Sequence, residues 1–424
     1  MRSTTIESEL LLRAEEHDGG RSSRALARMA QRGELVRVAP GTYVSTVQWF
    51  CLPGYDRQLL AVVALAQSRR RPVTFCGATA LRLHGLPDIR SKPVLDVRAA
   101  TRNQTGTRLQ VSPFVNTKAS LRIMTELQAQ GRLASNGRNV PMLPPIRNHW
   151  LPGDEPGEDV ELTVRLSDGS QVGRIRAVPL VSAMATVFGN EGLEVGTAAA
   201  DALHRWAVDP LLNRGQVRAV RSQRGPDGRT SRNGGGGGSR TGGGRADSGR
   251  GDIRKISPER LSAELGLLRD DAAALQELVE ASRARVKTKA AGIRFDRQWT
   301  FADGRAESPG ESLTRAVIHC LGFEVPDLQY PVHDQHGEFL GRVDFWWPSI
   351  RLVGEFDGHI KYGGTLGAAE DSGSAGRNAV TEEKRREDAI RREVDGFARW
   401  MWSDVRNTKL FAQLLEEFRV PRRP

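Results

Sequence analysis

The stretch GRVDFWWPSIRLVGEFDGHIKY, residues 341–362, decides the fold of the C-terminal part of the chain. Apolar and β-branched residues lie on both sides of Pro348-Ser349, and such a break between two strand-forming segments is typical of a β-hairpin. With the turn centred near Ser349, Asp344 falls opposite Glu355. We therefore expect two carboxylates to face each other across an antiparallel strand pair.

The two opposed acidic residues are candidate ligands for a divalent metal. Opposed residues of an antiparallel pair have Cβ atoms about 5 Å apart, a spacing at which two carboxylates can share one Mg²⁺ with oxygens at about 2.1 Å. Asp357 lies on the same face by strand alternation, and the other face carries apolar residues that can pack on a core. Crowded carboxylates repel one another unless a cation is present. We predict that Asp344 and Glu355 hold Mg²⁺ or Mn²⁺ on an outward-looking face.

An ordinary salt-bridged sheet surface also explains these charges. In the same hairpin Arg342 falls opposite Asp357, and Lys361 follows closely. Ion pairs on exposed surfaces are common and say little about function. This alternative predicts an ion pair between Arg342 and Asp357, and the sequence leaves it open.

Four segments of the C-terminal region follow one another in the order of a known nuclease superfamily. They are a helix-forming AESPGESLTRAVIHCLGF, the hairpin, a charged helix TEEKRREDAIRREV and a strand FARWMWSDV. With these segments, residues 303–418 resemble the PD-(D/E)XK nuclease superfamily, and in particular its branch related to very-short-patch-repair endonucleases. The resemblance implies an α/β restriction-endonuclease-like domain, which we place at residues 293–424.

The resemblance also implies roles for the acidic residues. Asp344 and Glu355 would hold the metal, which lowers the pKa of a bound water and stabilises charge on a scissile phosphate. Glu311 stands where the superfamily often has a helical acid. A first-turn acid after Ser308-Pro309 is equally favourable to the helix dipole without any chemistry, so both interpretations stay open.

Two basic residues complete the candidate site. The superfamily usually has Glu-x-Lys where this chain has Glu355-Phe356-Asp357, which leaves the lysine role open, and Lys361 in DGHIKY could reach back from the strand end to fill it. We include Asp357 and Lys361 among the candidate catalytic residues, with a plain surface lysine as the alternative. Arg399 alternates with aromatic residues in FARWMW and is a candidate phosphate contact, although an arginine on a strand face is often simply solvated.

The first fifty residues have the order of a winged helix-turn-helix. An apolar-periodic helix is expected at Ile6–Glu16, and a second helix, SSRALARMAQRG, begins at a Ser22 or Ser23 cap. Two short strands around Pro40-Gly41 form the expected wing. Three arginines repeat every four residues along the outer side of the second helix: Arg24, Arg28 and Arg32.

The segment QRGELVRVAPGTYV, residues 31–44, resembles the N-terminal domain of the AbiEi family of antitoxins, which are transcriptional autoregulators of type IV toxin-antitoxin systems. The resemblance implies that the basic helix enters the major groove of DNA and that the wing touches phosphates. Arg24, Arg28 and Arg37 are then the main contacts, with Arg32 on the same stripe. The alternative is a solvated helix face without a ligand.

The central region is less informative. Residues 51–212 alternate helix and strand patterns, are similar to the middle region of AbiEi-like proteins, and predict an α+β domain of unassigned role. His84 precedes Gly-Leu-Pro and is read as a helix cap. Residues 213–256 have the Gly, Arg and Ser content of a flexible linker. Residues 257–292 predict a long amphipathic helix that packs on the nuclease-like domain or mediates self-association.

Composition limits the class of protein. The chain has 424 residues, enough for several domains, and a formal net charge of +11, which favours a polyanionic partner. No segment suggests a membrane span or a signal peptide, so a cytoplasmic location is expected. The three cysteines are widely spaced and odd in number, which argues against a disulfide framework and a zinc site.

The sequence therefore predicts a multidomain α+β protein with an N-terminal winged helix-turn-helix at 1–50. The expected function is Mg²⁺-dependent endonuclease cleavage of DNA, targeted by the winged helix, in phage defence or DNA repair. The alternative is a non-catalytic transcriptional regulator or antitoxin with a cognate toxin and an inactive nuclease fold. A weaker third reading is general RNA or chromosome binding through the arginine-glycine linker. The oligomeric state and the target sequence are not encoded in any pattern that we can interpret.

Overall fold

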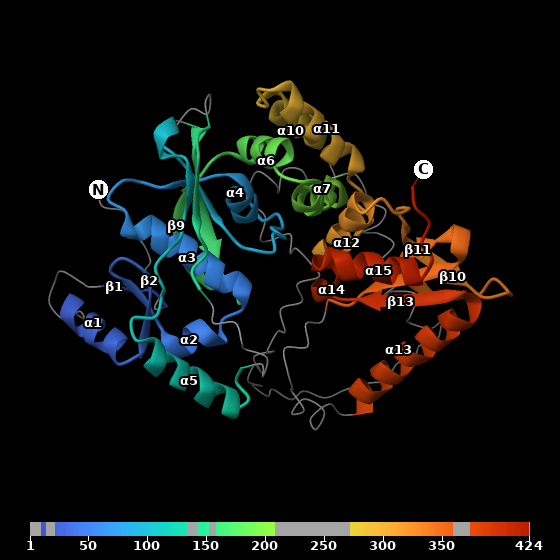
Figure 1. Ribbon diagram of the computed structural model, residues 1–424, viewed down its shortest axis with the longest axis horizontal. Helices are drawn as coiled ribbons and strands as arrows, with labels where there is room; N and C mark the ends of the chain where they lie inside the picture. Colours follow the sequence, from blue (N-terminus) through green and yellow to red (C-terminus); the bar gives the residue numbers. More distant parts are fainter. Residues whose placement is uncertain are drawn as a thin grey trace, which may run out of the picture.

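The computed structural model describes most of the chain as a mixed α+β structure with β-sheets at both ends and in the middle (Figure 1). The described residues are 10–13, 22–133, 142–151, 158–207, 272–358 and 374–423, with side chains in the last range from residue 384. The predicted linker and Lys361 lie outside these ranges. None of the described helices has the length and apolar content that a bilayer crossing requires.

A three-stranded sheet of order β1-β3-β2 forms the N-terminal unit, with helix α1 beside it. The bounds are β1 Leu12–Arg13, α1 Ser23–Gln31, β2 Leu35–Ala39 and β3 Thr42–Ser45. Ser22 caps α1 as predicted, because its hydroxyl accepts a hydrogen bond from the Ala25 N–H. The predicted helix at Ile6–Glu16 is wrong at its described part, since Leu12 pairs with Tyr43 as a strand. The consecutive leucines at 10–12 suit a strand at the edge of the wing better than a one-sided helix.

Gly33 joins α1 to the sheet and to a distant helix. Its φ of +81° ends α1 in the left-handed conformation that glycine adopts freely. A Cβ at this position would lie 2.6 Å from the Ala119 Cβ. Helix α5, which carries Ala119, is therefore held directly against the end of α1, and the Asn116 side chain donates to the Gln31 carbonyl across the same contact.

A six-stranded mixed sheet of order β6-β7-β5-β4-β9-β8 forms the middle domain. Its strands are β4 Thr74–Phe75, β5 Leu95–Arg98, β6 Gly106–Arg108, β7 Ile146–His149, β8 Val160–Arg165 and β9 Gln171–Ala177. Its helices are α2 Thr46–Cys51, α3 Gly54–Ser68, α4 Gly77–Leu83, η1 Arg102–Gln104, α5 Thr117–Ala129, α6 Leu180–Asn190 and α7 Leu193–Ala207. The alternation of helices and strands predicted for residues 51–212 is confirmed in the described part of this range.

A buried charge network holds the centre of this sheet. The Asp96 side chain on β5 is fully buried and accepts from Arg90 at 2.7 Å, from Arg147 at 2.7 Å and from His149 at 2.8 Å. It also meets the Thr79 N–H in the first turn of α4. Burial alone raises the pKa of Asp96, but the His149 hydrogen bond and the two arginine charges outweigh it and lower this pKa to about 2.

We expect Asp96 to make folding stability depend on acid. A carboxyl whose pKa is lower in the folded state stabilises that state above its unfolded pKa, and the contribution is lost as the pH falls through the folded pKa. Between pH 5 and pH 2 the native chain should lose about 2 kcal/mol from this residue. Urea unfolding across this pH range should show the slope, and Asp96→Asn should lack it and be less stable by about 3 kcal/mol at pH 7, because Arg90 and Arg147 each lose one of two carboxylate partners.

Asp168, in an exposed turn, is the matched control. Asp168→Asn should change the stability at pH 7 by less than about 1 kcal/mol. An Asp96→Asn protein as stable as the native chain would contradict the role of this network.

A four-stranded sheet of order β10-β11-β12-β13 forms the C-terminal domain. Its elements are α12 Pro309–Cys320, β10 Asp327–His333, β11 Phe339–Trp347, η4 Pro348–Ile350, β12 Leu352–Phe356, α13 Ser374–Glu393, β13 Gly396–Trp400, α14 Trp402–Arg406 and α15 Thr408–Glu417. β13 runs parallel to β12, whereas the other neighbours are antiparallel. The core on one side includes Phe345, Trp347 and Trp400, and the core under α13 includes Trp346 and Val353.

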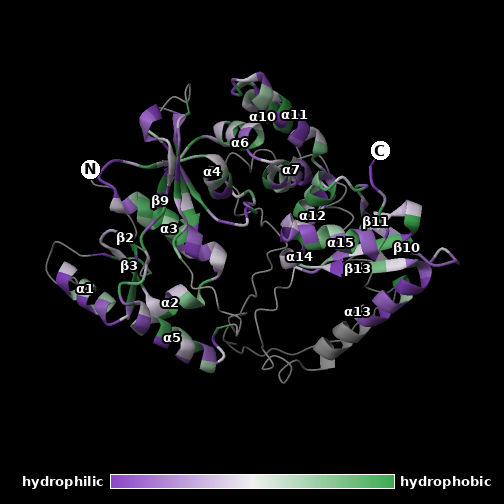
Figure 2. Cartoon of the chain, in the orientation of Figure 1, coloured by the Kyte–Doolittle hydropathy of each residue, from purple (hydrophilic) through white to green (hydrophobic). Residues whose placement is uncertain are grey.

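Helices lie on both sides of this sheet, with α12, α14 and α15 on one side and α13 on the other (Figure 1). In Figure 2 the coloured part of α13, residues 384–393, is mostly hydrophilic, in keeping with a helix that covers a sheet and faces solvent. The predicted charged helix and last core strand are confirmed at α13 and β13.

The predicted long helix at 257–292 is wrong in its described part, which is two helices. α10 spans Ala272–Ala284 and α11 spans Lys289–Phe301, and the Thr288 side chain starts α11 by capping the Ala291 N–H. Leu275, Val279 and Phe295 belong to the core of the middle domain. These helices therefore connect the middle and C-terminal domains through packing against α6 and α7.

Candidate functional site

The hairpin that carries the candidate acids has the predicted register. Phe345 pairs with Gly354 and Trp347 with Leu352, so the next pair outward in the same register is Asp344 with Glu355. Beyond the short η4 turn, Arg351 takes a left-handed φ of +45° that reverses the chain. The Phe356 N–H donates to Asp344 Oδ2 at 2.9 Å and fixes the end of the pair.

Helix α12 brings a third acid to this hairpin. Ser308 caps the helix, and its hydroxyl donates to Glu311 Oε1 at 2.7 Å. The Glu307 N–H and the Gln329 side-chain amide each donate to Glu311 Oε2 at 2.8 Å. The Glu311 side chain is therefore held by three donors, and the residue is only 5% exposed.

Gln329 links the helical acid to the hairpin. The register of β10 with β11 places Gln329 opposite Asp344, and its amide lies 2.8 Å from Glu311 and 3.4 Å from Asp344 Oδ1. Its φ of +54° is in the left-handed region, which is unfavourable for a residue with a side chain. Strained backbone of this kind persists where the surroundings over-determine it, often at functional sites. Sequence reasoning missed Gln329, since nothing in its local pattern signals this conformation.

The electrostatics of the pair match two carboxylates held close together without a counter-ion. Burial raises the pKa of Glu311 most, the nearby Asp344 charge raises it further, and the hydrogen bonds from Ser308, Glu307 and Gln329 offset part of the effect, which leaves this pKa at about 8. Glu311 is thus an acid in the first turn of α12 and also a neighbour of Asp344. Its place in the helix and its place beside the candidate metal ligand are compatible with each other.

We expect Gln329→Glu to destabilise the metal-free protein by about 2 kcal/mol or more at pH 8. The change replaces a donor shared by two carboxylates with a third carboxylate, and unpaired buried charge is costly. Urea unfolding of the variant in EDTA should show the loss, and Mn²⁺ should reverse part of it. Gln335→Glu in an exposed turn should have almost no effect on unfolding, and equal behaviour of the two variants would contradict the geometry.

Glu355 lies in a half-buried, charged setting. Its carboxylate is 3.9 Å from Arg386 on α13 and 3.8 Å from Arg399 on β13. Arg399 also pairs with Glu387 at 2.9 Å. The expectation that the acidic face looks outward is therefore wrong in part, because α13 covers this side of the sheet. The predicted phosphate contact of Arg399, whose side chain is 42% exposed, stays a prediction.

Asp357, a further predicted residue, lies just after the end of β12. Its N–H donates to the Trp400 carbonyl at 2.9 Å. Arg342 forms an ion pair with Glu307 at 2.5 Å, so the predicted pairing of Arg342 with Asp357 is wrong. The segment 302–308 brings the Glu307 carboxylate within ion-pair distance of the Arg342 guanidinium. Lys361 lies outside the described residues.

The acidic residues fit a divalent ion. Within the described residues no three His, Cys, Asp or Glu side chains form a complete ligand set. Mg²⁺ needs no such set, since it is usually held by one or two carboxylates and keeps several waters. Asp344 and Glu311 lie close together at the Gln329 amide, and Glu355, one pair beyond the printed β11–β12 register, lies beside Arg386 and Arg399. Positive charge at this point would relieve the repulsion between Asp344 and Glu311.

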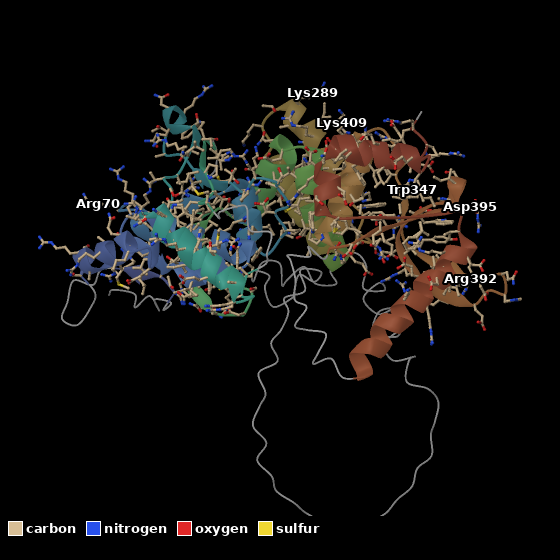
Figure 3. All side chains as sticks on the ribbon, turned by 60° about the horizontal axis from the view of Figure 1, so that its bottom comes forward. Arg70, Lys289, Trp347, Arg392, Asp395 and Lys409 are labelled. Carbon is tan, nitrogen blue, oxygen red and sulfur yellow. The ribbon has the colours of Figure 1, made fainter. Side chains whose placement is uncertain are left out.

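The predicted basic residues of the N-terminal unit lie on one exposed helix. Arg24, Arg28 and Arg32 of α1 are exposed, and Arg32 pairs with Glu34 at 2.5 Å. Arg37 on β2 is half-buried. In Figure 3, α1 and α5 lie together on the face that comes forward.

Helix α5 adds two cations that sequence reasoning missed. Lys118 and Arg122 are exposed, one helical turn apart, and Lys118 precedes the Ala119 that touches Gly33. No motif marks them, because their place beside α1 comes from a tertiary contact.

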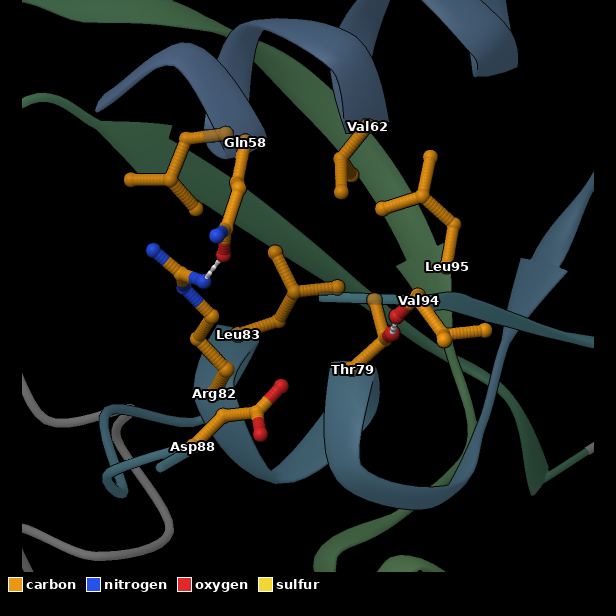
Figure 4. A pocket seen from close by; sticks show the side chains of 9 residues that line it. Gln58, Val62, Thr79, Arg82, Leu83, Asp88, Val94 and Leu95 are labelled. Atoms are coloured by element: carbon orange, nitrogen blue, oxygen red, sulfur yellow. Dashed lines mark hydrogen bonds between the residues drawn. The ribbon is translucent and has the colours of Figure 1, made fainter. Parts of the chain in front are cut away.

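A small cavity in the middle domain is not a substrate site. Its volume of about 10 Å³ holds no more than one water. Figure 4 shows Arg82 beside it, with a hydrogen bond to Gln58. His84 is fully buried and hydrogen-bonds the Val178 carbonyl at 2.9 Å, so the cap interpretation of this residue holds.

Comparisons with known proteins give a short match. The chain is 53% identical over 57 residues to the uncharacterized protein MT2308 of Mycobacterium tuberculosis strain CDC 1551 / Oshkosh and to the uncharacterized protein Rv2248 of strain H37Rv. Each match covers 13% of this chain and 21% of the relative. No family model matches the sequence, and no solved structure matches.

Proposed function

We propose that the protein binds DNA and cleaves it in a Mg²⁺-dependent reaction, with the C-terminal domain as a PD-(D/E)XK-type endonuclease. One observation carries the proposal: Glu311 of α12 and Asp344 of β11 meet at one Gln329 amide, next to the end of the β11–β12 pairing. Continuing the β11–β12 register by one pair puts Glu355 opposite Asp344. The close approach of Glu311 and Asp344 is poorly explained by stability, since two carboxylates repel each other.

In this proposal Asp344 and Glu355 hold the ion, and Glu311 is a neighbouring acid that ligates it directly or through water. A bound Mg²⁺ supplies a water of lowered pKa and stabilises charge on the scissile phosphate. The chain's own residues orient the acids: the Gln329 amide spans Glu311 and Asp344, and the Phe356 N–H fixes Asp344. Arg386 and Arg399 beside Glu355 provide positive charge for the phosphate backbone.

The N-terminal unit would choose where the protein binds. A winged helix-turn-helix reading is supported by α1 and by the β2–β3 hairpin, although the described residues 10–13 are a strand. Arg24 and Arg28 would meet DNA, and Lys118 and Arg122 of α5 would extend the surface to neighbouring phosphates. A role in phage defence or DNA repair would follow from such targeting.

A second candidate function is a non-catalytic regulator or antitoxin that has kept the shape of a nuclease. The ion pairs of Glu355 with Arg386 and Arg399 favour it, because basic side chains here occupy the position of a cation. The two candidates agree on DNA binding and differ in the chemistry of the acids.

Cleavage of supercoiled and linear DNA separates the two functions. With Mg²⁺ or Mn²⁺ the native chain should cut, EDTA should stop it, and an Asp344→Asn/Glu355→Gln double variant should lose at least about a thousandfold in rate while it keeps its DNA affinity. Glu338→Gln, on the exposed β10–β11 turn, is the matched control and should cut normally. No cutting by folded protein that binds DNA would favour the regulator.

Salt dependence tests the basic surface. An Arg24→Ala/Arg28→Ala variant should bind duplex DNA more weakly, and the slope of log K against log salt should fall by about 2, since each phosphate contact contributes about 0.9. Fluorescence anisotropy at several salt concentrations measures both quantities. An Arg174→Ala/Arg176→Ala variant removes two exposed arginines of β9 and should leave the slope unchanged. Equal slopes in both variants would contradict this surface.

A further inference from the structure

We propose that Arg205, in the last turn of helix α7 of the middle domain, is a positioning residue for Glu311 in the C-terminal domain. The inference rests on the proposed metal site. In this proposal the middle domain forms part of the framework of the metal site. The sequence predicts only a flexible linker and a long helix between the two domains.

Helix α7 packs directly on α12, the helix that carries Glu311. The Asp201 side chain accepts from Arg315 of α12 at 2.8 Å, and the pair is 0% and 5% exposed. Asp201 also accepts from the Asp303 N–H at 2.8 Å. A buried ion pair needs good geometry to offset the cost of desolvation. This contact therefore fixes α7, α12 and the segment before α12 relative to one another.

Arg205 lies one turn beyond Asp201 and contacts the segment before α12 at a point closer to Glu311. Its guanidinium donates to the Glu307 carbonyl at 2.5 Å. The segment approaches α7 so closely that a Cβ on Gly304 would lie 2.9 Å from the Arg205 backbone nitrogen. Only a residue without a side chain allows this approach.

Glu307 connects Arg205 to the candidate site through its hydrogen bonds. Arg205 holds its carbonyl, Arg342 of β11 holds its carboxylate at 2.5 Å, and its own N–H donates to Glu311 Oε2 at 2.8 Å. The N–H thus points at the carboxylate because the residue is held from two sides. Without Arg205, the Glu307 carbonyl loses this donor, and the Glu307 N–H that donates to the Glu311 oxygen is held less firmly.

Residues that orient ligands from behind have a recognisable effect on metal binding. Their loss typically lowers metal affinity by 10- to 100-fold, even where the fold survives. A purely structural residue at a domain contact would instead lower the free energy of unfolding and leave the affinity of the folded protein unchanged. Metal affinity and stability, measured on the same samples, therefore separate the two roles.

The test uses the full chain and isothermal titration calorimetry with Mn²⁺, alongside urea unfolding. Arg205→Met should weaken Mn²⁺ binding by about tenfold or more, whereas Arg205→Lys, which can still donate to one carbonyl, should recover most of the affinity. Val279→Ala, in the buried core of the middle domain, is the control for a purely structural loss: it should lower stability and leave the Mn²⁺ dissociation constant within about twofold of the native value.

Gly304→Ala gives a second approach if Arg205→Met does not fold. Its Cβ pushes the segment away from α7 and should weaken Mn²⁺ binding as Arg205→Met does. Native affinity in Arg205→Met or Gly304→Ala, or an equal loss in Val279→Ala, would overturn the positioning role. Absence of Mn²⁺ binding by the native chain is a different result, since it would overturn the proposed metal site itself.

Discussion

The antiparallel register between β11 and β12 is the constraint on which the candidate site depends. A slip of one residue would turn either Asp344 or Glu355 to the opposite face of the sheet. The register is set by buried aromatic residues such as Phe345 and Trp347 and by the tight reversal at Arg351. The same packing that stabilises the C-terminal domain therefore also places the two acids.

The acids are stabilised by donors rather than by burial. Glu311 is almost fully buried, yet three hydrogen-bond donors hold it, and one of them, the Gln329 amide, is shared with Asp344. Glu355 sits between arginines of α13 and β13. A site built in this way can exist without a cation, and a cation would replace repulsion between the acids with attraction. This arrangement is compatible with both proposed functions, and the difference between them lies in whether the ion binds.

Local sequence patterns predicted the elements of this site well. The hairpin, its register, the Ser308 cap of α12 and the strand β13 all follow from turn residues, capping residues and side-chain alternation over short stretches. The left-handed Gln329 could not be predicted, because its conformation is imposed by neighbours on α12 and β11. The same holds for Arg205, which meets Glu307 across 102 residues of sequence.

Local sequence patterns gave a wrong prediction where the same run of apolar residues suits both a helix and a strand. Leucines at 10–12 suit a helix face or a strand edge, and pairing with β3 decides for the strand. The helices α10 and α11 have the amphipathic spacing expected of them, but spacing does not name the surface that they cover, which is the middle domain.

The decisive measurement is anomalous diffraction at the manganese edge from crystals of the full chain grown with Mn²⁺. The metal-site interpretation predicts a single strong peak with the carboxylates of Asp344 and Glu355 within about 2.5 Å of it and Glu311 close by. A well-ordered site without a peak, in which Arg386 or Arg399 contacts Glu355 directly, would contradict it and leave a DNA-binding regulator.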